Sequence, residues 1–309
     1  AHMSILTDAF PLALGGNPFG WTSDEATSHA VLDAFVDGGG QVVDTSDSYG
    51  AGASESIIGS WLASTGRRED VVLASKVSRH PDRRGLAPDT VRLAVDEQLA
   101  RLRTDHLDVL WAHYDDADTP LEETLATFDE LVTAGEVREL GISNYEPARI
   151  TEWLTLAEQN GWRAPIALQP EYSLLRRHAF EDQRQALAVE HHLAVLPYWG
   201  LASGLLTGKY HSLDDLGQAS DERRGSIVER YASTAAFAVV DVLREVAAAH
   251  DAEPATVALA WLLGRPGITA PIASVSRVAQ LPALLAVPAL ELTDDETTRL
   301  TAASDTVGE

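Results

Sequence analysis

Residues 41–50 read QVVDTSDSYG, a short apolar run followed at once by polar residues and a glycine. The β-branched valines are typical of a buried strand, and the Asp-Ser-Tyr-Gly that follows is typical of a loop. The strand would therefore deliver an acid, Asp44, and a phenol, Tyr49, to the point where it ends. The function of this pair depends on which other side chains the fold brings to the same place.

Seven further apolar runs alternate with amphipathic helical patterns: LALGG (12–16), VVLASKV (71–77), LDVLWAH (107–113), VRELGIS (137–143), PIALQ (165–169), LAVLPY (193–198) and ITAPIA (268–273). Continuous apolar strands that alternate with helices predict a parallel sheet covered by helices. Eight such strands in 309 residues predict an α/β fold, the (β/α)8 TIM barrel. An open doubly wound sheet is the alternative, because periodicity cannot show closure.

Helix boundaries support this alternation. Ser23-Asp24 opens a predicted helix that ends at glycines 38–40, and Thr119-Pro120 opens another that ends near Gly135. No linker divides the chain, which predicts a single domain over residues 1–309, with a probable expression-tag remnant at 1–3. The weakly patterned stretch at 211–226, HSLDDLGQASDERRGS, is predicted to be a lid or mobile loop.

Composition excludes several functions. The chain has 47 acidic and 23 basic residues, a formal net charge of −24, which disfavours nucleic acid and anionic membranes as partners. It has no cysteine, which excludes disulfides, thiolate catalysis and cysteine-based zinc sites. The most apolar stretch, 193–206, is too short and too interrupted to span a bilayer, so a cytoplasmic protein is expected. The oligomeric state is not predicted.

Polar side chains follow the predicted strands, where a barrel of this kind carries its site. Lys76 ends one strand, and a buried ammonium needs a counter-charge that Asp44 on the neighbouring strand could supply. An ammonium beside Tyr49 would lower the pKa of the phenol and so improve it as a proton donor. His113 could hold a substrate oxygen or relay a proton. These four residues suit protonation of an alkoxide as it forms on a carbonyl.

The remaining strand ends carry hydroxyl, amide and aromatic groups, at Ser143, Asn144, Gln169 and Tyr198. The hydroxyl and the two amides match a carboxamide, and Tyr198 offers an aromatic face for a flat ring. Together they predict a nicotinamide pocket, and hence oxidoreduction by hydride transfer.

The ordered motifs DTSDSYG (44–50), GISN (141–144), QPEYSLLRR (169–177) and GLLTGKY (204–210), with Lys76 and His113, resemble the aldo-keto reductase superfamily over nearly the whole chain. The resemblance implies an NAD(P)H-dependent barrel with a catalytic tetrad in which Tyr49 is the general acid. The tetrad falls on Asp44, Tyr49, Lys76 and His113. It further implies that the carboxamide is held by Ser143, Asn144 and Gln169, with the nicotinamide stacked on Tyr198.

The resemblance also implies contacts along the rest of the cofactor, with residues 201–209 crossing the pyrophosphate. The matching positions are Gly16, Asp44, Leu201, Ser203, Lys209, Ser274, Ser276, Arg277 and Gln280. Arg277 is the only cation in the segment 274–277, and arginine suits a 2′-phosphate, so NADP(H) is expected in preference to NAD(H). The sequence departs from the usual Tyr-Ser-Pro-Leu at residues 198–201, where it reads YWGL.

Aromatic residues in the loops, Trp21, Tyr114 and Trp199, predict a substrate rim around Tyr49 and His113. The expected substrate is a small-molecule carbonyl or alcohol: an aldehyde, a ketone or a keto-sugar. One alternative is a cofactor-binding regulatory subunit with little turnover. Another is a metal-dependent barrel hydrolase with ligands among His113, Asp115, Asp116 and His191-His192, although the last two precede a strand and should lie on the opposite face from the site.

Overall fold

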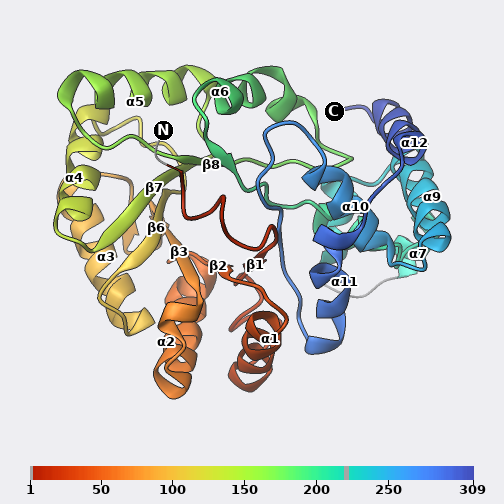
Figure 1. The fold of residues 1–309 in the computed structure, drawn as a ribbon, viewed down its shortest axis with the longest axis horizontal. Helices are drawn as coiled ribbons and strands as arrows, with labels where there is room; N and C mark the ends of the chain where they lie inside the picture. Colours follow the sequence, from red (N-terminus) through yellow and green to blue (C-terminus); the bar gives the residue numbers. More distant parts are fainter. Residues whose placement is uncertain (1–2, 219–222) are drawn as a thin grey trace.

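The computed structural model describes residues 3–218 and 223–309, drawn in Figure 1. Eight parallel strands form one sheet, in the order β10-β1-β2-β3-β6-β7-β8-β9. Their bounds are β1 (Ala13–Gly15), β2 (Val42–Asp44), β3 (Val72–Val77), β6 (Leu107–Ala112), β7 (Val137–Ser143), β8 (Ala167–Gln169), β9 (Ala194–Val195) and β10 (Ile272–Ala273). Each of the eight predicted runs contains one of these strands.

The sheet closes into a barrel between its two outermost strands. The backbone N–H of Thr269 donates to the carbonyl of Val195, and that of Ile272 donates to the carbonyl of Pro197, each at 2.9 Å. These bonds join the β9 and β10 sides of the sheet. The (β/α)8 barrel is therefore confirmed, and the open doubly wound alternative is wrong.

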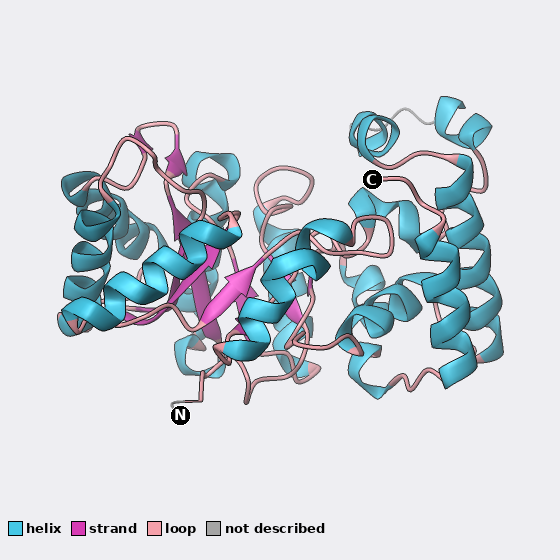
Figure 2. Cartoon of the chain, turned by 90° about the horizontal axis from the view of Figure 1, so that it is seen from above, coloured by secondary structure: helices cyan, strands magenta, loops and turns pink. Residues whose placement is uncertain are grey.

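Helices surround the strands, as the view from above in Figure 2 shows. They are α1 (Glu25–Asp37), α2 (Ala53–Thr65), α3 (Pro88–Leu102), α4 (Leu121–Thr133), α5 (Pro147–Asn160), α6 (Gln185–Glu190), α7 (Leu213–Gln218), α8 (Arg223–Arg230), α9 (Thr234–Ala249), α10 (Pro254–Leu263), α11 (Leu281–Leu285) and α12 (Asp294–Asp305). Short 3₁₀ or π turns occupy Tyr49–Gly52, Arg68–Asp70, Phe180–Arg184, Ala202–Thr207, Val278–Gln280 and Val287–Ala289. Helices α9 and α12 pack side by side at one end of the molecule (Figure 1).

Local sequence signals explain several of these boundaries. Asp24 caps α1, since its side chain accepts a hydrogen bond from the N–H of Thr27, as predicted for that position. Helix α4 starts directly after Pro120 and ends before Gly135, whose φ of 81° is one that glycine adopts most readily. Thr293 and Glu296 form a reciprocal capping box at the start of α12.

Two parts of the chain differ from the sequence prediction. An antiparallel hairpin of β4 (Arg79–His80) and β5 (Arg83–Arg84) extends beyond β3, where no secondary structure was expected. The stretch 211–226, predicted as a loop, contains α7 and the start of α8. The part of that lid prediction that falls on 219–222 lies outside the described residues.

A small apolar cluster fills the barrel itself, and a larger one lies between the strands and the helices. In the inner cluster, Gly141 makes room for Trp111: a Cβ at position 141 would lie 2.4 Å from the indole ring. Leu6 joins this cluster from the N-terminal segment, which is tied down by a 2.7 Å hydrogen bond from Ser4 Oγ to Glu139 Oε2. The segment therefore covers the barrel at the N-terminal ends of its strands.

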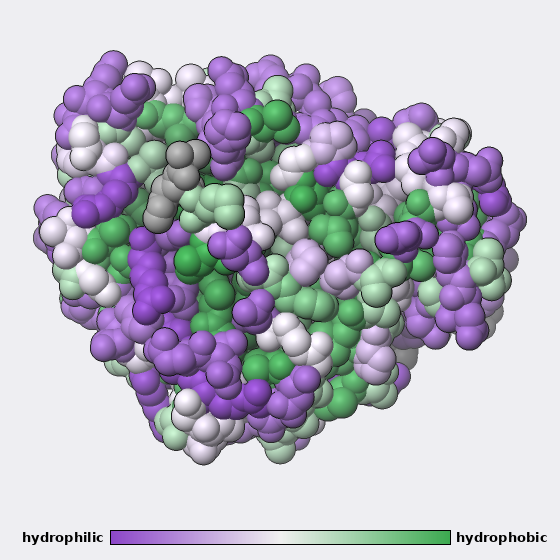
Figure 3. Space-filling model, viewed as in Figure 1, coloured by the Kyte–Doolittle hydropathy of each residue, from purple (hydrophilic) through white to green (hydrophobic). Residues whose placement is uncertain are grey.

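Hydrophilic and apolar residues are unevenly distributed over the surface. The face seen in Figure 3 is hydrophilic around most of its edge, with apolar side chains gathered over the middle. None of the helices in the described ranges, 3–218 and 223–309, has both the length and the apolar character that crossing a membrane requires.

Candidate active site

Strand alternation brings the predicted side chains to one place. Residues two apart on a strand face the same side, and Val42, Ala74 and Ala167 belong to the cluster inside the barrel. The residues two positions further along, at the carboxyl ends of β2, β3 and β8, are Asp44, Lys76 and Gln169. All three are buried, with exposed fractions of 3% or less.

Lys76 is the centre of the arrangement. Its Nζ donates to Asp44 Oδ2 at 2.5 Å, to the carbonyl of Thr45 at 2.8 Å and to the hydroxyl of Tyr49 at 3.3 Å. The three donors of an ammonium therefore all have partners. Burial opposes the charge of this lysine, but Asp44 and Tyr49 outweigh that cost and raise the lysine pKa. Lys76 is held charged beside the phenol.

The pKa of Tyr49 departs from the sequence prediction. Burial raises it above its ordinary value, and the opposing effect of Lys76, through charge and through their hydrogen bond, does not compensate. Desolvation disfavours a phenolate strongly when protein surrounds it. Tyr49 is thus a neutral phenol that carries its proton over the whole physiological range, with the ammonium placed to stabilise the anion left when the proton leaves.

A left-handed turn fixes the Tyr49 backbone. Gly50, Ala51 and Gly52 follow it with φ values of 60°, 52° and 97°. Alanine adopts such a conformation only at a cost, so the surrounding structure must hold it there. The turn leads directly into α2, and Tyr49 is its first residue.

His113 approaches Tyr49 from the end of β6. The two ring centroids are 6.5 Å apart and the rings are nearly perpendicular. Burial lowers the pKa of His113 to about 2, helped by the charges of Lys76 and Arg79. The imidazole is therefore neutral, and its Nδ1 lies 3.4 Å from the hydroxyl of Ser46. If that hydroxyl donates, Nε2 carries the hydrogen and can donate in turn.

The predicted amide and hydroxyl groups form a connected set next to these residues. Asn144 Nδ2 donates to the carbonyl of His113 at 3.0 Å, and Asn144 Oδ1 accepts from the hydroxyl of Tyr198. Gln169 Nε2 donates to Asp44 Oδ1 at 3.2 Å, and Ser143 Oγ donates to the carbonyl of Gln169 at 2.7 Å. The structure therefore links the residues predicted to donate the proton and those predicted to bind the carboxamide through Asp44 and His113.

The segment after Tyr198 has an unusual backbone. Trp199, Ala202, Ser203 and Gly204 all have positive φ, between 50° and 100°, around Leu201. Such strain persists only where the surroundings over-determine it, and it concentrates at ligand-binding segments. Lys209, further along, lies with its ammonium 5.3 Å from the centre of the Tyr210 ring.

The remaining predicted cofactor positions lie around the ends of β1 and β10. Ser274 Oγ donates to Asn17 Oδ1, and the carbonyl of Ser276 accepts from Ser23 at 2.7 Å. Gln280 is engaged locally, because its Oε1 accepts from the N–H of Ser276. Arg277 is exposed, and its guanidinium makes no ion pair within the described part of the chain. Gly16 is buried against Ser54 and Thr45.

The three rim aromatics are partly exposed, with Trp21 at 55%, Trp199 at 42% and Tyr114 at 37%. The Tyr114 ring lies 5.0 Å from the ring of His113, which places it beside the predicted catalytic residues. Trp199 packs edge-on against Tyr198, and the guanidinium of Arg230 covers it at 4.3 Å. Helix α8 therefore ends against this rim.

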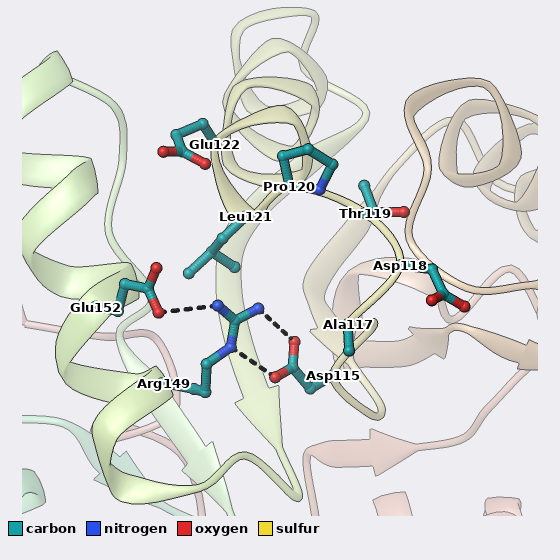
Figure 4. A pocket seen from close by; sticks show the side chains of 9 residues that line it. All are labelled: Asp115, Ala117, Asp118, Thr119, Pro120, Leu121, Glu122, Arg149 and Glu152. Atoms are coloured by element: carbon teal, nitrogen blue, oxygen red, sulfur yellow. Dashed lines mark hydrogen bonds and ion pairs between the residues drawn. The ribbon is translucent and has the colours of Figure 1, made fainter.

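The residues proposed as metal ligands are engaged elsewhere. Figure 4 shows Asp115 in a surface pocket of about 580 Å³, held by two hydrogen bonds from Arg149. Asp116 accepts from the N–H of Leu86 and from Thr119. His191 and His192 line a separate pocket with Ser4, at the N-terminal ends of the strands, as the sequence predicts. These residues do not converge, and the hydrolase alternative loses its basis.

Two side chains near the site were missed. Asp47 is fully buried, and in the described part of the chain neither of its carboxylate oxygens has a hydrogen-bond partner. Burial and the neighbouring Glu55 raise its pKa to about 8. The second is Arg79, whose guanidinium lies 4.3 Å from the centre of the Tyr114 ring. Its signal in the sequence is SRHPDRR at 78–84, a basic run in an acidic chain.

Comparison with known proteins agrees with this geometry. A model of the aldo/keto reductase family matches residues 11–305. The uncharacterized oxidoreductase YrpG of Bacillus subtilis is 34% identical over 87% of this chain and 84% of its own. The Schizosaccharomyces pombe aldo-keto reductase yakc, whose name specifies NADP(+), is 30% identical over 85% and 78%. A probable voltage-gated potassium channel subunit beta of Arabidopsis thaliana is 30% identical over 85% and 82%. With a match of this extent, the chain is an oxidoreductase that belongs to the aldo/keto reductase family.

Proposed function

We propose that this protein transfers a hydride between NAD(P)H and the carbonyl carbon of an aldehyde, ketone or keto-sugar. Tyr49 is the general acid in this proposal. Asp44 and Lys76 assist it, and His113 positions the carbonyl oxygen. The observation that carries the proposal is the hydrogen-bonded chain from the buried Asp44 and Lys76 to the hydroxyl of the half-buried Tyr49, at the end of the barrel.

The chain's own residues account for the proton. Reduction of a carbonyl places negative charge on its oxygen, and the neutral phenol of Tyr49 can supply a proton there. The charge then passes to the phenolate, which Lys76 stabilises at 3.3 Å. A neutral His113 can donate a hydrogen bond to the same oxygen, but burial lowers its pKa to about 2, so near neutral pH no imidazolium is present to supply a proton. Tyr49 therefore supplies the proton, and His113 orients the carbonyl oxygen.

The donor set near the tetrad fits a nicotinamide cofactor. Ser143, Asn144 and Gln169 supply hydroxyl and amide groups next to Asp44, and Tyr198 supplies an aromatic face. The strained segment that includes Ser203 and Gly204 suits an extended phosphate-bearing ligand. When bound, the cofactor supplies the hydride.

The preference for NADP(H) over NAD(H) is part of the proposal. Arg277 follows β10 and is exposed without an acidic partner in the described ranges, so its guanidinium is available to a 2′-phosphate. A named relative that uses NADP(+) is consistent with this preference.

A titration followed by a turnover assay tests the proposal. Tryptophan fluorescence is measured during titration with NADPH and, in parallel, NADH, since Trp199 lies beside Tyr198. We expect saturable quenching with tighter binding of NADPH, followed by consumption of the reduced cofactor when an aromatic aldehyde is added. A folded sample that binds neither cofactor would exclude the proposal.

A regulatory subunit is a second candidate, because one relative is named as a probable potassium channel subunit. The same experiment separates the two functions. Saturable cofactor binding without turnover of any of a panel of aldehydes, ketones and keto-sugars would favour the regulatory role.

A further inference from the structure

The hairpin beyond β3 carries an unusual pair of arginines. Arg79 of β4 lies directly opposite Arg84 of β5 in antiparallel register. Side chains opposite one another in such a pair are on the same face, with Cβ atoms about 5 Å apart, and like charges placed there are destabilising. Both residues are exposed. The pairing therefore costs stability unless an anion lies between or beside the two guanidinium groups.

The described residues offer these two arginines no acidic partner. Arg83, between them on the hairpin, pairs with Glu97, whereas Arg79 and Arg84 make no ion pair in residues 3–218 and 223–309. Asp116, whose carboxylate lies next to Gly85, accepts hydrogen bonds from the N–H of Leu86 and from the hydroxyl of Thr119. Two cations without acidic partners in the described residues therefore lie opposite one another on this short hairpin, in a chain with a net charge of −24.

A strained residue fixes the hairpin against the candidate site. Ser78 has a φ of 107°, which a residue with a side chain rarely adopts. Its Oγ accepts a hydrogen bond from the N–H of Tyr114 at 3.1 Å, and its carbonyl accepts from the N–H of Gly85 at 3.0 Å. The strained turn thus ties both ends of the hairpin to the residue that follows His113. Strain of this kind concentrates at functional sites.

The position of Arg79 connects the hairpin to the reacting groups. Its guanidinium lies 4.3 Å from the centre of the Tyr114 ring, and that ring lies 5.0 Å from the ring of His113. The charge of Arg79 also contributes to lowering the pKa of His113, so its field reaches the candidate site. An anionic group on a substrate whose carbonyl meets Tyr49 and His113 would come within reach of this arginine.

We propose that Arg79, with Arg84 beside it, binds an anionic group of the substrate, so that the preferred substrate is a carbonyl compound carrying a carboxylate or phosphate. This inference rests on the proposed carbonyl reduction and names its substrate class. The aromatic face of Tyr114 holds the Arg79 guanidinium in place, and arginine's planar fork matches either anion. The hairpin lies at the ends of β3 and β6, away from Arg277 beyond β10, so the two cation sites are distinct.

A matched pair of substrates tests the proposal: para-carboxybenzaldehyde and its methyl ester, which differ mainly in charge. We expect the wild-type protein to show a higher kcat/KM for the acid. Arg79→Met should lower that value about tenfold and change the value for the ester by less than about twofold. Arg79→Lys should retain part of the preference. Arg92→Met removes the same charge from the exposed face of α3 and should leave both values unchanged.

Salt and phosphate extend the test. Raising the ionic strength should reduce kcat/KM for the acid and not for the ester. A phosphorylated aldehyde, glyceraldehyde 3-phosphate, compared with glyceraldehyde then distinguishes a phosphate from a carboxylate as the preferred anion. Equal acid-to-ester ratios in the wild-type protein and Arg79→Met would overturn the proposal, and so would a loss of NADPH affinity as the main effect of Arg79→Met.

Failure of the proposed function is distinguishable from failure of the anion site. If neither aldehyde is reduced, calorimetric binding of the two compounds decides. If the acid binds more tightly than the ester and the difference depends on Arg79, the anion site is supported although the proposed carbonyl reduction is rejected. Equal binding of acid and ester to the wild-type protein overturns the anion site.

Discussion

Lys76 Nζ lies 2.5 Å from Asp44 Oδ2, across the boundary between two adjacent strands, and both side chains are almost completely buried. Removing one partner of such a pair leaves an uncompensated charge in the protein interior. We expect Lys76→Met and Asp44→Asn each to lower the free energy of unfolding by about 3–5 kcal/mol. The loss of unfolding free energy in the double variant, measured by urea unfolding, should be much smaller than the sum of the losses in the two single variants. Additive losses would show that the two charges are not coupled.

Tyr49→Phe tests the proton donor. The change removes one hydroxyl, which accepts a hydrogen bond from Lys76, so the fold should be retained. Carbonyl reduction should fall by about a hundredfold or more, because general acid catalysis contributes on this scale. The dissociation constant of NADPH, measured by fluorescence, should change little. Unchanged turnover would remove Tyr49 from the acid role.

Arg277→Ala tests the cofactor preference. The guanidinium has no acidic partner to lose in the described part of the chain, so stability should not change. The dissociation constant should rise about tenfold or more for NADPH and little for NADH, since charge-assisted hydrogen bonds to the 2′-phosphate are lost only in the first case. Equal effects on both cofactors would contradict the assignment.

The raised pKa of Asp47 should make the stability of the protein depend on pH in an unusual way. Its pKa in the folded protein is raised from 3.8 to about 8, mainly by burial. Between these values the folded chain holds a proton that the unfolded chain has released. Stability should therefore fall as pH rises through this interval, with a slope of about 1.4 kcal/mol per pH unit from this group.

The charges that act on Asp47 are Glu55, Arg101, Lys76 and Glu97. Urea unfolding at a series of pH values compares the wild-type protein with Asp47→Asn, which mimics the protonated acid, and with Asp96→Asn, an exposed control on α3. The difference between Asp47→Asn and the wild-type protein should grow towards pH 8. A constant difference would mean that Asp47 is already charged at low pH.

The sequence predicts the barrel well because its strands are buried on both faces and therefore appear as continuous apolar runs. It predicts the convergence of Asp44, Lys76, His113 and Gln169 for a related reason, since parallel strands place their carboxyl ends at one rim. What it cannot give is the environment of each group. The pKa of Tyr49 was expected to fall and instead rises, because the cost of burial depends on residues that the fold brings from other strands.

The β4–β5 hairpin was missed for a different reason. Its strands contain two residues each, and His80-Pro81 interrupts any period-two pattern. Only the basic composition of residues 78–84 marks the segment, and charge alone carries no information about register. The opposition of Arg79 and Arg84 is thus a property of the structure that the sequence does not express.

The N-terminal segment gives the barrel a floor. Leu6 packs into the inner cluster and Ser4 is hydrogen-bonded to Glu139, so the barrel is closed at the N-terminal ends of its strands and open only at the other end. Whatever reaches Tyr49 must arrive and depart over the same rim, past Arg79, Tyr114 and Trp199. Substrates can therefore be selected at the rim, before they reach Tyr49 and His113.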